Sequence, residues 1–474
     1  MATQGEDGLG AERAERTPGA PTGSISLEGM HGSVEVPRHQ AGFWQQWRAF
    51  VGPAILVSVG YMDPGNWGTD LQGGAQFKFG LLWVVGLASL MAIFMQGISA
   101  RLGVVTGKDL AQCCRDWYPK WTRWPNWLFC ELAIGACDLA EVLGSAVAIN
   151  IMFHIPLLWA VIITGLDVLL LLALQRFGMR TIEAIVLLLV ATIGACYYIE
   201  IFVLPQTQPS FLQMGHAFFR PSLRAPGMIY VAIGIIGATV MPHNLYLHSA
   251  LVQSRRFQKD EASIRSAIRF NTIDSVTALS IAFFVNAAIM VLAAMVFFGK
   301  NSVTIPGGKI VTFSPDSDWI RIAYLTLAPL LGTTLASALF VIALLASGQS
   351  STITGTLAGQ VVMEGFMHWR IQPWLRRLIT RALAIIPAVL VIGIRGDSSV
   401  NDLLTLSQVI LALQLPFAMF PLLHFTSSGQ RMGSWKNGWF LLLAGWGSAV
   451  FITIMDLCGL PDSLKSAWHV IIGG

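Results

Sequence analysis

Two segments far apart in the chain each combine a proline with side chains that can bind a metal ion. They read Asp63-Pro64-Gly65-Asn66 and Met241-Pro242-His243-Asn244. Both have the form x-Pro-x-Asn, and both lie inside long apolar stretches. Proline and glycine interrupt helical hydrogen bonding, so each segment predicts a broken helix whose freed backbone groups bind protein, water or an ion. The alternative is that each proline makes an ordinary kink.

The side chains at these breaks offer oxygen and sulfur donors. Asp63 supplies a carboxylate, Asn66 an amide oxygen and Met241 a thioether. Unwound helices also expose carbonyl groups, and Ala238 is well placed to offer one. Magnesium and calcium prefer hard oxygen ligands, whereas softer divalent ions tolerate or prefer sulfur. We therefore expect a transition ion such as manganese(II) or iron(II), with Met241 acting against hard ions; the alternative role of Met241 is gap-filling.

Titratable groups lie close to the breaks in sequence or on a nearby apolar stretch. His243 directly follows Pro242, and histidine titrates nearest physiological pH; it either takes part in proton coupling or is a structural histidine. Glu131, Asp138 and Glu141 are spaced seven and three apart, which places them on one helix face and predicts a polar pathway. Arg381 is their candidate counter-charge, and the alternative is a structural ion pair.

Composition indicates which elements must position these residues. The chain has 474 residues, of which 54% are apolar and only 12% charged, and its mean hydropathy is +0.62. Soluble domains carry roughly 25% charged residues. The chain is therefore expected to be an all-α polytopic membrane protein, and a disordered chain, a disulfide scaffold, a coiled coil and a cytosolic enzyme are excluded.

Apolar stretches long enough to cross a bilayer recur along the chain. Eleven spans are predicted near 49–78, 80–104, 126–152, 156–175, 181–204, 227–254, 272–299, 326–364, 378–396, 401–425 and 437–459. Most of the Lys and Arg residues fall in segments that a cytosolic N-terminus places inside, so we expect the N-terminus inside and the C-terminus outside. Spans one and six are five helices apart and thus run in opposite directions, as in an inverted repeat.

Several motifs together resemble the Nramp family of proton-coupled divalent-metal transporters, in its bacterial, MntH-like branch, over essentially residues 45–460. Besides the two breaks, they are Leu245-Tyr246-Leu247-His248-Ser249, Gly348-Gln349-Ser350-Ser351, Ser407-Gln408 and Leu415-Pro416-Phe417. The resemblance implies a LeuT-like fold of five plus five inverted helices with broken helices 1 and 6, an added eleventh helix, and alternating access. The tail before residue 45 has no match in the family, and no twelfth span follows.

The resemblance also assigns residue roles. It implies metal ligands at Asp63, Asn66, Met241 and the carbonyl of Ala238, with Gln408 reaching the ion when the outer gate closes. It gives proton-exit roles to the acids of the third span and to Arg381. Three further polar residues in apolar surroundings, expected to support the helices, are His248, Asn286 and Gln349.

These observations predict a proton-coupled symporter, not an enzyme, that imports manganese(II) and iron(II), and cobalt or cadmium as further candidates. The alternatives are a related transporter of a harder ion such as magnesium, and a sodium-coupled transporter of an organic solute on the same fold. A membrane metalloenzyme is disfavoured because no HExxH motif occurs. We expect no cofactor, no nucleic-acid partner, a monomer, and a location in the plasma (inner) membrane.

The same interpretation of the sequence divides the chain into four parts. Residues 1–44 are expected to form a disordered cytosolic tail, 45–204 the first repeat half, 226–425 the second half, and 437–460 the eleventh helix.

Overall fold

The computed structural model describes residues 31–37, 41–166, 179–198, 210–304, 310–313, 319–323, 334–396 and 399–472. Its helices are α1 (Phe43–Phe50), α2 (Pro53–Gly60), α3 (Pro64–Phe77), α4 (Leu82–Thr106), α5 (Leu110–Trp117), α6 (Arg123–Phe153), α7 (Leu157–Ile163), α9 (Met179–Tyr198), α10 (Phe211–Phe218), α11 (Met228–Val240), α12 (Pro242–Leu251), α13 (Glu261–Val296), α15 (Thr334–Met367), α16 (Pro373–Arg395), α17 (Val400–Ser427), α18 (Gly429–Met432) and α19 (Trp439–Ile472). Its short strands are β1 (Val34–Glu35), β2 (Arg255–Arg256), β3 (Ser302–Thr304) and β4 (Ile310–Thr312).

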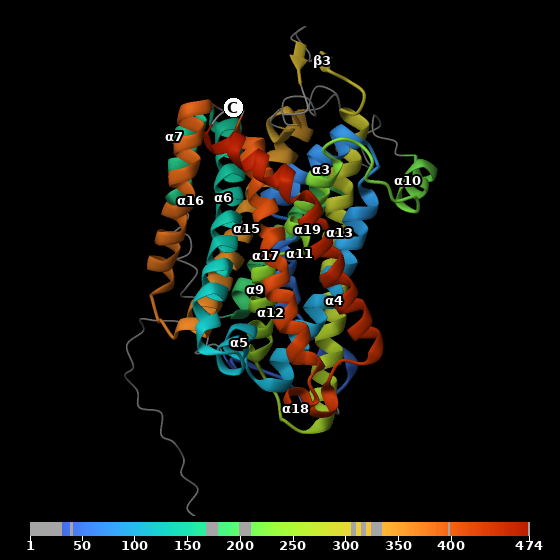
Figure 1. The fold of residues 1–474 in the computed structure, drawn as a ribbon, viewed down its shortest axis with the longest axis vertical. Coiled ribbons are helices and arrows are strands. Elements are labelled where there is room, and N and C mark those ends of the chain that lie inside the picture. The colour runs from blue at the N-terminus through green and yellow to red at the C-terminus, as the bar shows by residue number, and fades with distance from the viewer. Residues whose placement is uncertain are drawn as a thin grey trace, which may run out of the picture.

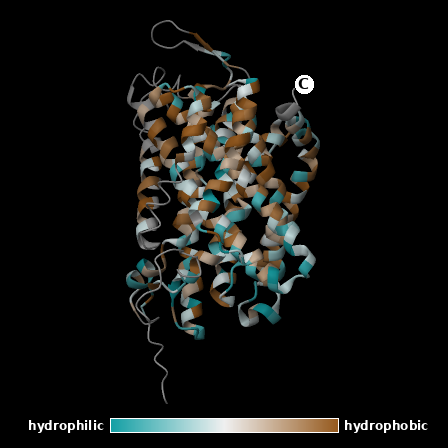
Figure 2. Cartoon of the chain, turned by 90° about the vertical axis from the view of Figure 1, so that its left-hand side faces the viewer, coloured by the Kyte–Doolittle hydropathy of each residue, from teal (hydrophilic) through white to brown (hydrophobic). Residues whose placement is uncertain are grey.

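The long helices form a bundle whose axes follow the long axis of the molecule (Figure 1). In the described part of the chain, eight helices are long and apolar enough to cross a membrane. The other three predicted spans correspond to the broken pair α2 and α3, to α7, and to α9; the fourth and fifth spans continue into residues outside the described ranges. Apolar residues dominate the middle of the bundle, and hydrophilic residues gather toward the end that carries α5 and α18 (Figures 1 and 2). The prediction of an all-α polytopic membrane protein is confirmed.

Several predicted spans are shorter than the helices that contain them, because polar residues outside the apolar stretch start or extend the helix. The seventh span was predicted from 272, yet α13 begins at Glu261, where Asp260 accepts a hydrogen bond from the backbone N–H of Ser263. The ninth was predicted from 378, whereas α16 begins at Pro373, at a position where the missing N–H of proline does no harm. The last helix continues past residue 459 to Ile472, through Pro461.

The chain before the first broken helix is tied to the chain after the second one. Strand β1 pairs in parallel with β2, and the N–H of Gly32 donates to the carbonyl of Gln253 over 3.0 Å. The guanidinium of Arg255 donates to the carbonyls of Ala49 and Val51, just ahead of α2. At the opposite end, β3 and β4 form an antiparallel pair beyond α13.

Glycines allow the helices around the two breaks to approach closely. A Cβ added to Gly237 of α11 would lie 2.0 Å from the carbonyl oxygen of Gln408 in α17, and one added to Gly74 of α3 would lie 2.2 Å from that of Met290 in α13. Small residues at such crossings let membrane helices pack backbone to backbone. The two broken helices are thereby held against α13 and α17.

Candidate functional site

The first broken helix separates α2 from α3 at Asp63, which is fully buried. Asp63 is the N-cap of α3, and its Oδ1 accepts a 2.8 Å hydrogen bond from the backbone N–H of Asn66. Pro64 occupies the first helical turn, where it restarts the helix without losing a hydrogen bond. The break therefore fixes a carboxylate at the N-terminus of a half-helix, which favours negative charge.

The second broken helix separates α11 from α12 at Met241. This residue has φ +31°, a backbone conformation that non-glycine residues rarely adopt, and Pro242 opens the next helix. Such strain costs of order 1–3 kcal/mol and persists where the surroundings hold it. The break directs the fully buried Met241 side chain toward the first broken helix, since a Cβ added to Gly60 would lie 3.1 Å from its sulfur.

Oxygen atoms from both breaks converge on the side-chain amide of Asn66. Its Nδ2 donates to the Asp63 Oδ1 over 2.8 Å, to the carbonyl of Ala238 over 3.0 Å and to the carbonyl of Gly60 over 3.3 Å. Three acceptors within hydrogen-bonding distance of one atom form a small, electron-rich cradle. A cation at this point would gain the same three oxygen donors.

The cradle has a single carboxylate. The described residues contain no group of three or more His, Cys, Asp or Glu side chains that could hold a metal. Asp63 is the only carboxylate of the cradle, and no described Lys or Arg forms an ion pair with it. A buried carboxylate without a counter-charge is unfavourable, so an arriving cation or proton stabilises it.

Gln408 of α17 lies directly against the first break. A Cβ added to Gly65 would lie 2.1 Å from Gln408 Nε2, which donates to Ser407 Oγ over 2.9 Å. Gln408 Oε1 is buried and has no hydrogen-bond partner among the described residues. This amide oxygen is thus available beside Gly65 of the first break.

The supporting polar residues differ in their distance from the breaks. Asn286 of α13 donates to the carbonyl of Tyr61 over 2.8 Å and to Asn66 Oδ1 over 3.2 Å, so it contacts the first break directly. His248 Nδ1 lies 3.0 Å from Gln96 Oε1, and Gln96 in turn donates to the hydroxyl of Tyr61. Two other predicted residues are placed as follows. Gln349 is half-buried on α15, and His243 is buried, with no hydrogen-bond partner for its Nδ1 in the described chain.

The acids of α6 face basic residues of α16, which include Arg377 as well as the expected Arg381. Arg377 binds both Asp138 and Glu141, the latter over 3.0 Å. Arg381 lies 3.6 Å from Glu141 Oε2 and donates to the carbonyl of Asp138 over 3.4 Å. All four side chains are buried.

The remaining acid, Glu131, pairs with the neighbouring arginine of the same helix. Both of its carboxylate oxygens lie 2.8 Å from Arg376 Nη2. The sequence analysis named neither Arg376 nor Arg377, which lie just before the predicted ninth span at 378–396. The spacing of four between Arg377 and Arg381, which puts both on one helix face, could have revealed Arg377.

A buried thiol lies between the cradle and this ion-pair network. Cys137 Sγ is 4.0 Å from Asp63 Oδ2 and 3.9 Å from Glu141 Oε1, and it belongs to a small buried cluster that includes Met241. Nothing in the apolar sequence around Cys137 marks it as part of a site. Two buried acids were also missed: Asp70 on α3, and Asp274, which accepts from the N–H groups of Gly52 and Ala54 at the start of α2.

The architecture defines a class: a polytopic membrane protein whose central site lies between two broken helices. Residues 54–460 match the family described as natural resistance-associated macrophage protein-like, Nramp. The chain belongs to the Nramp family, as its motifs predicted, and its fold is LeuT-like.

Relatives and solved structures agree with this assignment. A protein of Nostoc sp. named divalent metal cation transporter MntH is 49% identical and covers 94% of this chain and 97% of its own length. A protein of the same name from Listeria innocua is 44% identical, with 96% and 99% covered. The crystal structure of a mutant of the Eremococcus coleocola manganese transporter has a TM-score of 0.82 and 38% identity, and covers 94% of this chain and 95% of the other.

Proposed function

We propose that this chain is a proton-coupled symporter that imports divalent transition-metal ions, manganese(II) and iron(II) foremost, with cobalt and cadmium as further candidates. The single observation that carries the proposal is the convergence of Asp63 Oδ1 and the carbonyls of Ala238 and Gly60 on one point between the two breaks. The names of the curated relatives and of the solved transporter support it.

The donor set supports a transition ion over a hard ion. One carboxylate, neutral oxygens from Asn66 and Ala238, and the Met241 thioether form the proposed coordination sphere, which Gln408 completes when the outer side closes. Magnesium prefers an octahedral shell of oxygen atoms and releases water reluctantly, so a thioether disfavours it. Manganese(II) and iron(II) tolerate the mixed set.

Alternating access would follow from the geometry of the breaks. Each broken helix has two halves that can move separately about the irregular backbone at Asp63 and Met241. In this mechanism the outer halves α3 and α11 close over the ion, and the inner halves α2 and α12 then separate to release it. The repeat halves are residues 45–204 and 226–425, and the eleventh helix at 437–460 lies outside them.

The proton would use the polar connection from the cradle to α16. Asp63 carries a proton when no metal is bound. It loses this proton when the ion arrives, because the two positive charges of the ion stabilise the ionised carboxylate. His243 and the acids of α6 lead the proton away, and Arg381 helps to balance their charge. We further propose a monomer in the plasma (inner) membrane, with a cytosolic N-terminus and an external C-terminus.

The test is manganese(II) uptake into proteoliposomes with an internal pH dye, at outside pH 5.5 and 7.5. Saturable uptake that acidifies the lumen and resists excess calcium or magnesium is expected. Block by magnesium would favour a hard-ion transporter of the same family. Sodium-dependent uptake of an organic solute without metal uptake would favour the other alternative.

A further inference from the structure

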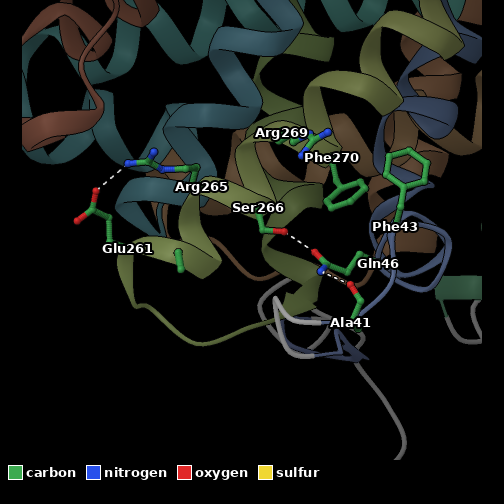
Figure 3. A pocket seen from close by; sticks show the side chains of 9 residues that line it. Ala41, Phe43, Gln46, Glu261, Arg265, Ser266, Arg269 and Phe270 are labelled. Carbon is green, nitrogen blue, oxygen red and sulfur yellow. Dashed lines mark hydrogen bonds and ion pairs between the residues drawn. The ribbon is translucent and has the colours of Figure 1, made fainter.

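An open pocket lies between α1 and the first turns of α13 (Figure 3). It is at the end of the molecule that carries α18 (Figure 1). We call it the α1–α13 pocket. It encloses about 760 Å³, and its lining includes Phe43, Gln46, Arg265, Ser266, Arg269 and Phe270. Its position is far from the two helix breaks, because α13 reaches Asn286 at the breaks about four turns after Phe270, the last lining residue of this helix.

Hydrogen bonds hold the two walls of the pocket in place. Gln46 of α1 donates to the carbonyl of Ala41 over 2.9 Å, and its Oε1 accepts from the hydroxyl of Ser266 on α13 (Figure 3). The ring of Phe43 lies 5.4 Å from that of Phe270, between centroids. The pocket is therefore a built feature with a polar and an aromatic wall.

The charge of the pocket is positive. Arg265 donates to Glu261 over 3.0 Å, so these two charges balance each other. Arg269 lines the same pocket, is exposed, and forms no ion pair within the described part of the chain. The pocket thus offers an available guanidinium, with a second one adjacent, and guanidinium groups suit phosphate oxygens.

One exposed stripe of α13 changes from basic to apolar along its length. Arg265 and Arg269 are followed on this face by Val276, which is 44% exposed, and the exposed surface then turns around the helix to Phe284, which is 68% exposed. Exposed apolar side chains on a membrane helix face acyl chains. The 36-residue helix is longer than the roughly 30 Å hydrocarbon core, so its first turns reach the headgroup layer.

Helix α1 carries the matching features of an interfacial segment. Trp44 and Phe43 are 70% and 45% exposed, and tryptophan favours the boundary between headgroups and acyl chains. The buried side of α1 packs Phe50 against Phe270, with the rings stacked 5.7 Å apart. These features are typical of a helix at a membrane surface, and α1 lies beside the basic part of α13.

We propose that the α1–α13 pocket binds an anionic phospholipid, with its phosphate at Arg269 and Arg265 and its acyl chains along Val276 and Phe284. A soluble phosphate ester would use the arginines but would leave the apolar stripe without a role. The continuity of basic and exposed apolar surface along α13 favours the lipid over the soluble ion.

The test uses the purified full-length chain and native mass spectrometry. The protein is exposed to equal amounts of phosphatidylglycerol and phosphatidylcholine with identical acyl chains. Preferential retention of phosphatidylglycerol is expected, and Arg269→Gln is expected to reduce that preference about fivefold, the effect of one basic residue at a charged surface. Arg269→Lys keeps the charge and is expected to retain most of the preference.

The matched control is Lys259→Gln, which removes an exposed basic residue that precedes α13 and lies outside this pocket. It is expected to leave the preference unchanged. Equal retention of both lipids by the wild type, or an unaltered preference in the Arg265→Gln/Arg269→Gln variant, would overturn the proposal. Displacement of the lipid by equimolar glycerol phosphate would also overturn it, in favour of a soluble phosphate ester.

Discussion

The side-chain amide of Asn66 donates a 3.0 Å hydrogen bond to the carbonyl oxygen of Ala238, and so joins the two broken helices directly. The same nitrogen also bonds Asp63 in its own break. Asn66 thus holds together the groups that we propose as metal ligands. A cation that enters the cradle must displace this amide nitrogen or turn the amide so that its oxygen faces the ion.

The first prediction concerns the carboxylate. Asp63→Asn keeps the shape of the side chain and its ability to accept from Asn66, but removes the negative charge that a cation requires. We expect manganese(II) uptake to be abolished, with at most a small change in melting temperature. Uptake at the wild-type rate by this variant or by Asp63→Ala would show that the ion binds elsewhere.

The second prediction concerns selectivity. Met241→Ala removes the thioether and leaves the oxygen donors, so hard ions compete better. We expect partial manganese(II) uptake and a loss of discrimination against calcium and magnesium on the order of tenfold, or about 1.4 kcal/mol. Competition uptake assays measure it. An unchanged inhibition profile would reduce Met241 to a packing residue.

The third prediction separates proton coupling from metal binding. His243→Ala removes a titratable group next to the second break without altering any of the proposed metal ligands. We expect manganese(II) affinity to be retained while luminal acidification per imported ion changes, as the pH dye reports. Unaltered acidification would assign His243 a structural role.

The fourth prediction compares two arginines of one helix. Arg377 bonds both Asp138 and Glu141, whereas Arg381 lies farther from Glu141. Arg377→Ala leaves two buried carboxylates poorly compensated and should destabilise the protein by about 3–5 kcal/mol. Arg381→Ala should destabilise the protein clearly less than Arg377→Ala. Melting temperatures in one detergent test this order, and equal losses would contradict it.

The fifth prediction uses two glycines that face the same residue. Gly65→Ala would press only on the side-chain amide of Gln408, which can rotate, whereas Gly237→Ala would press on its backbone carbonyl. We expect Gly65→Ala to fold and to change transport as Gln408→Ala does. Gly237→Ala should destabilise by about 1–3 kcal/mol, as overpacking does. A larger stability loss in Gly65→Ala would argue against this packing.

The sequence predicted the two breaks because proline and glycine act locally, and their effect is visible in a few residues. It also predicted that Glu131, Asp138 and Glu141 share a helix face, since that follows from periodicity alone. The roles of these residues stay predictions. The spacing of residues within one helix does not show which residues of other helices they contact.

Arg377 illustrates this limit. A basic residue beside an apolar stretch is typical of a cytosolic loop, and only the packing of α16 on α6 shows that it is buried. Cys137 illustrates it differently, because a small thiol among alanines gives no signal until Asp63 and Glu141 are seen on either side of it. The short β1–β2 pair joins two segments that are more than 200 residues apart, and no local sequence pattern predicts that they pair.

That β pair has a mechanical consequence. Backbone hydrogen bonds from Gly32 and Val36 to the segment around Arg256 act as a tether between the chain ahead of α2 and the chain behind α12. In the alternating access that we propose, separation of the inner halves breaks these hydrogen bonds unless the pair moves as one unit with α2 or with α12. Their breakage would make the amide protons exchangeable in step with opening. Hydrogen exchange at Gly32 and Val36 would then report how often this end of the molecule opens in the proposed cycle.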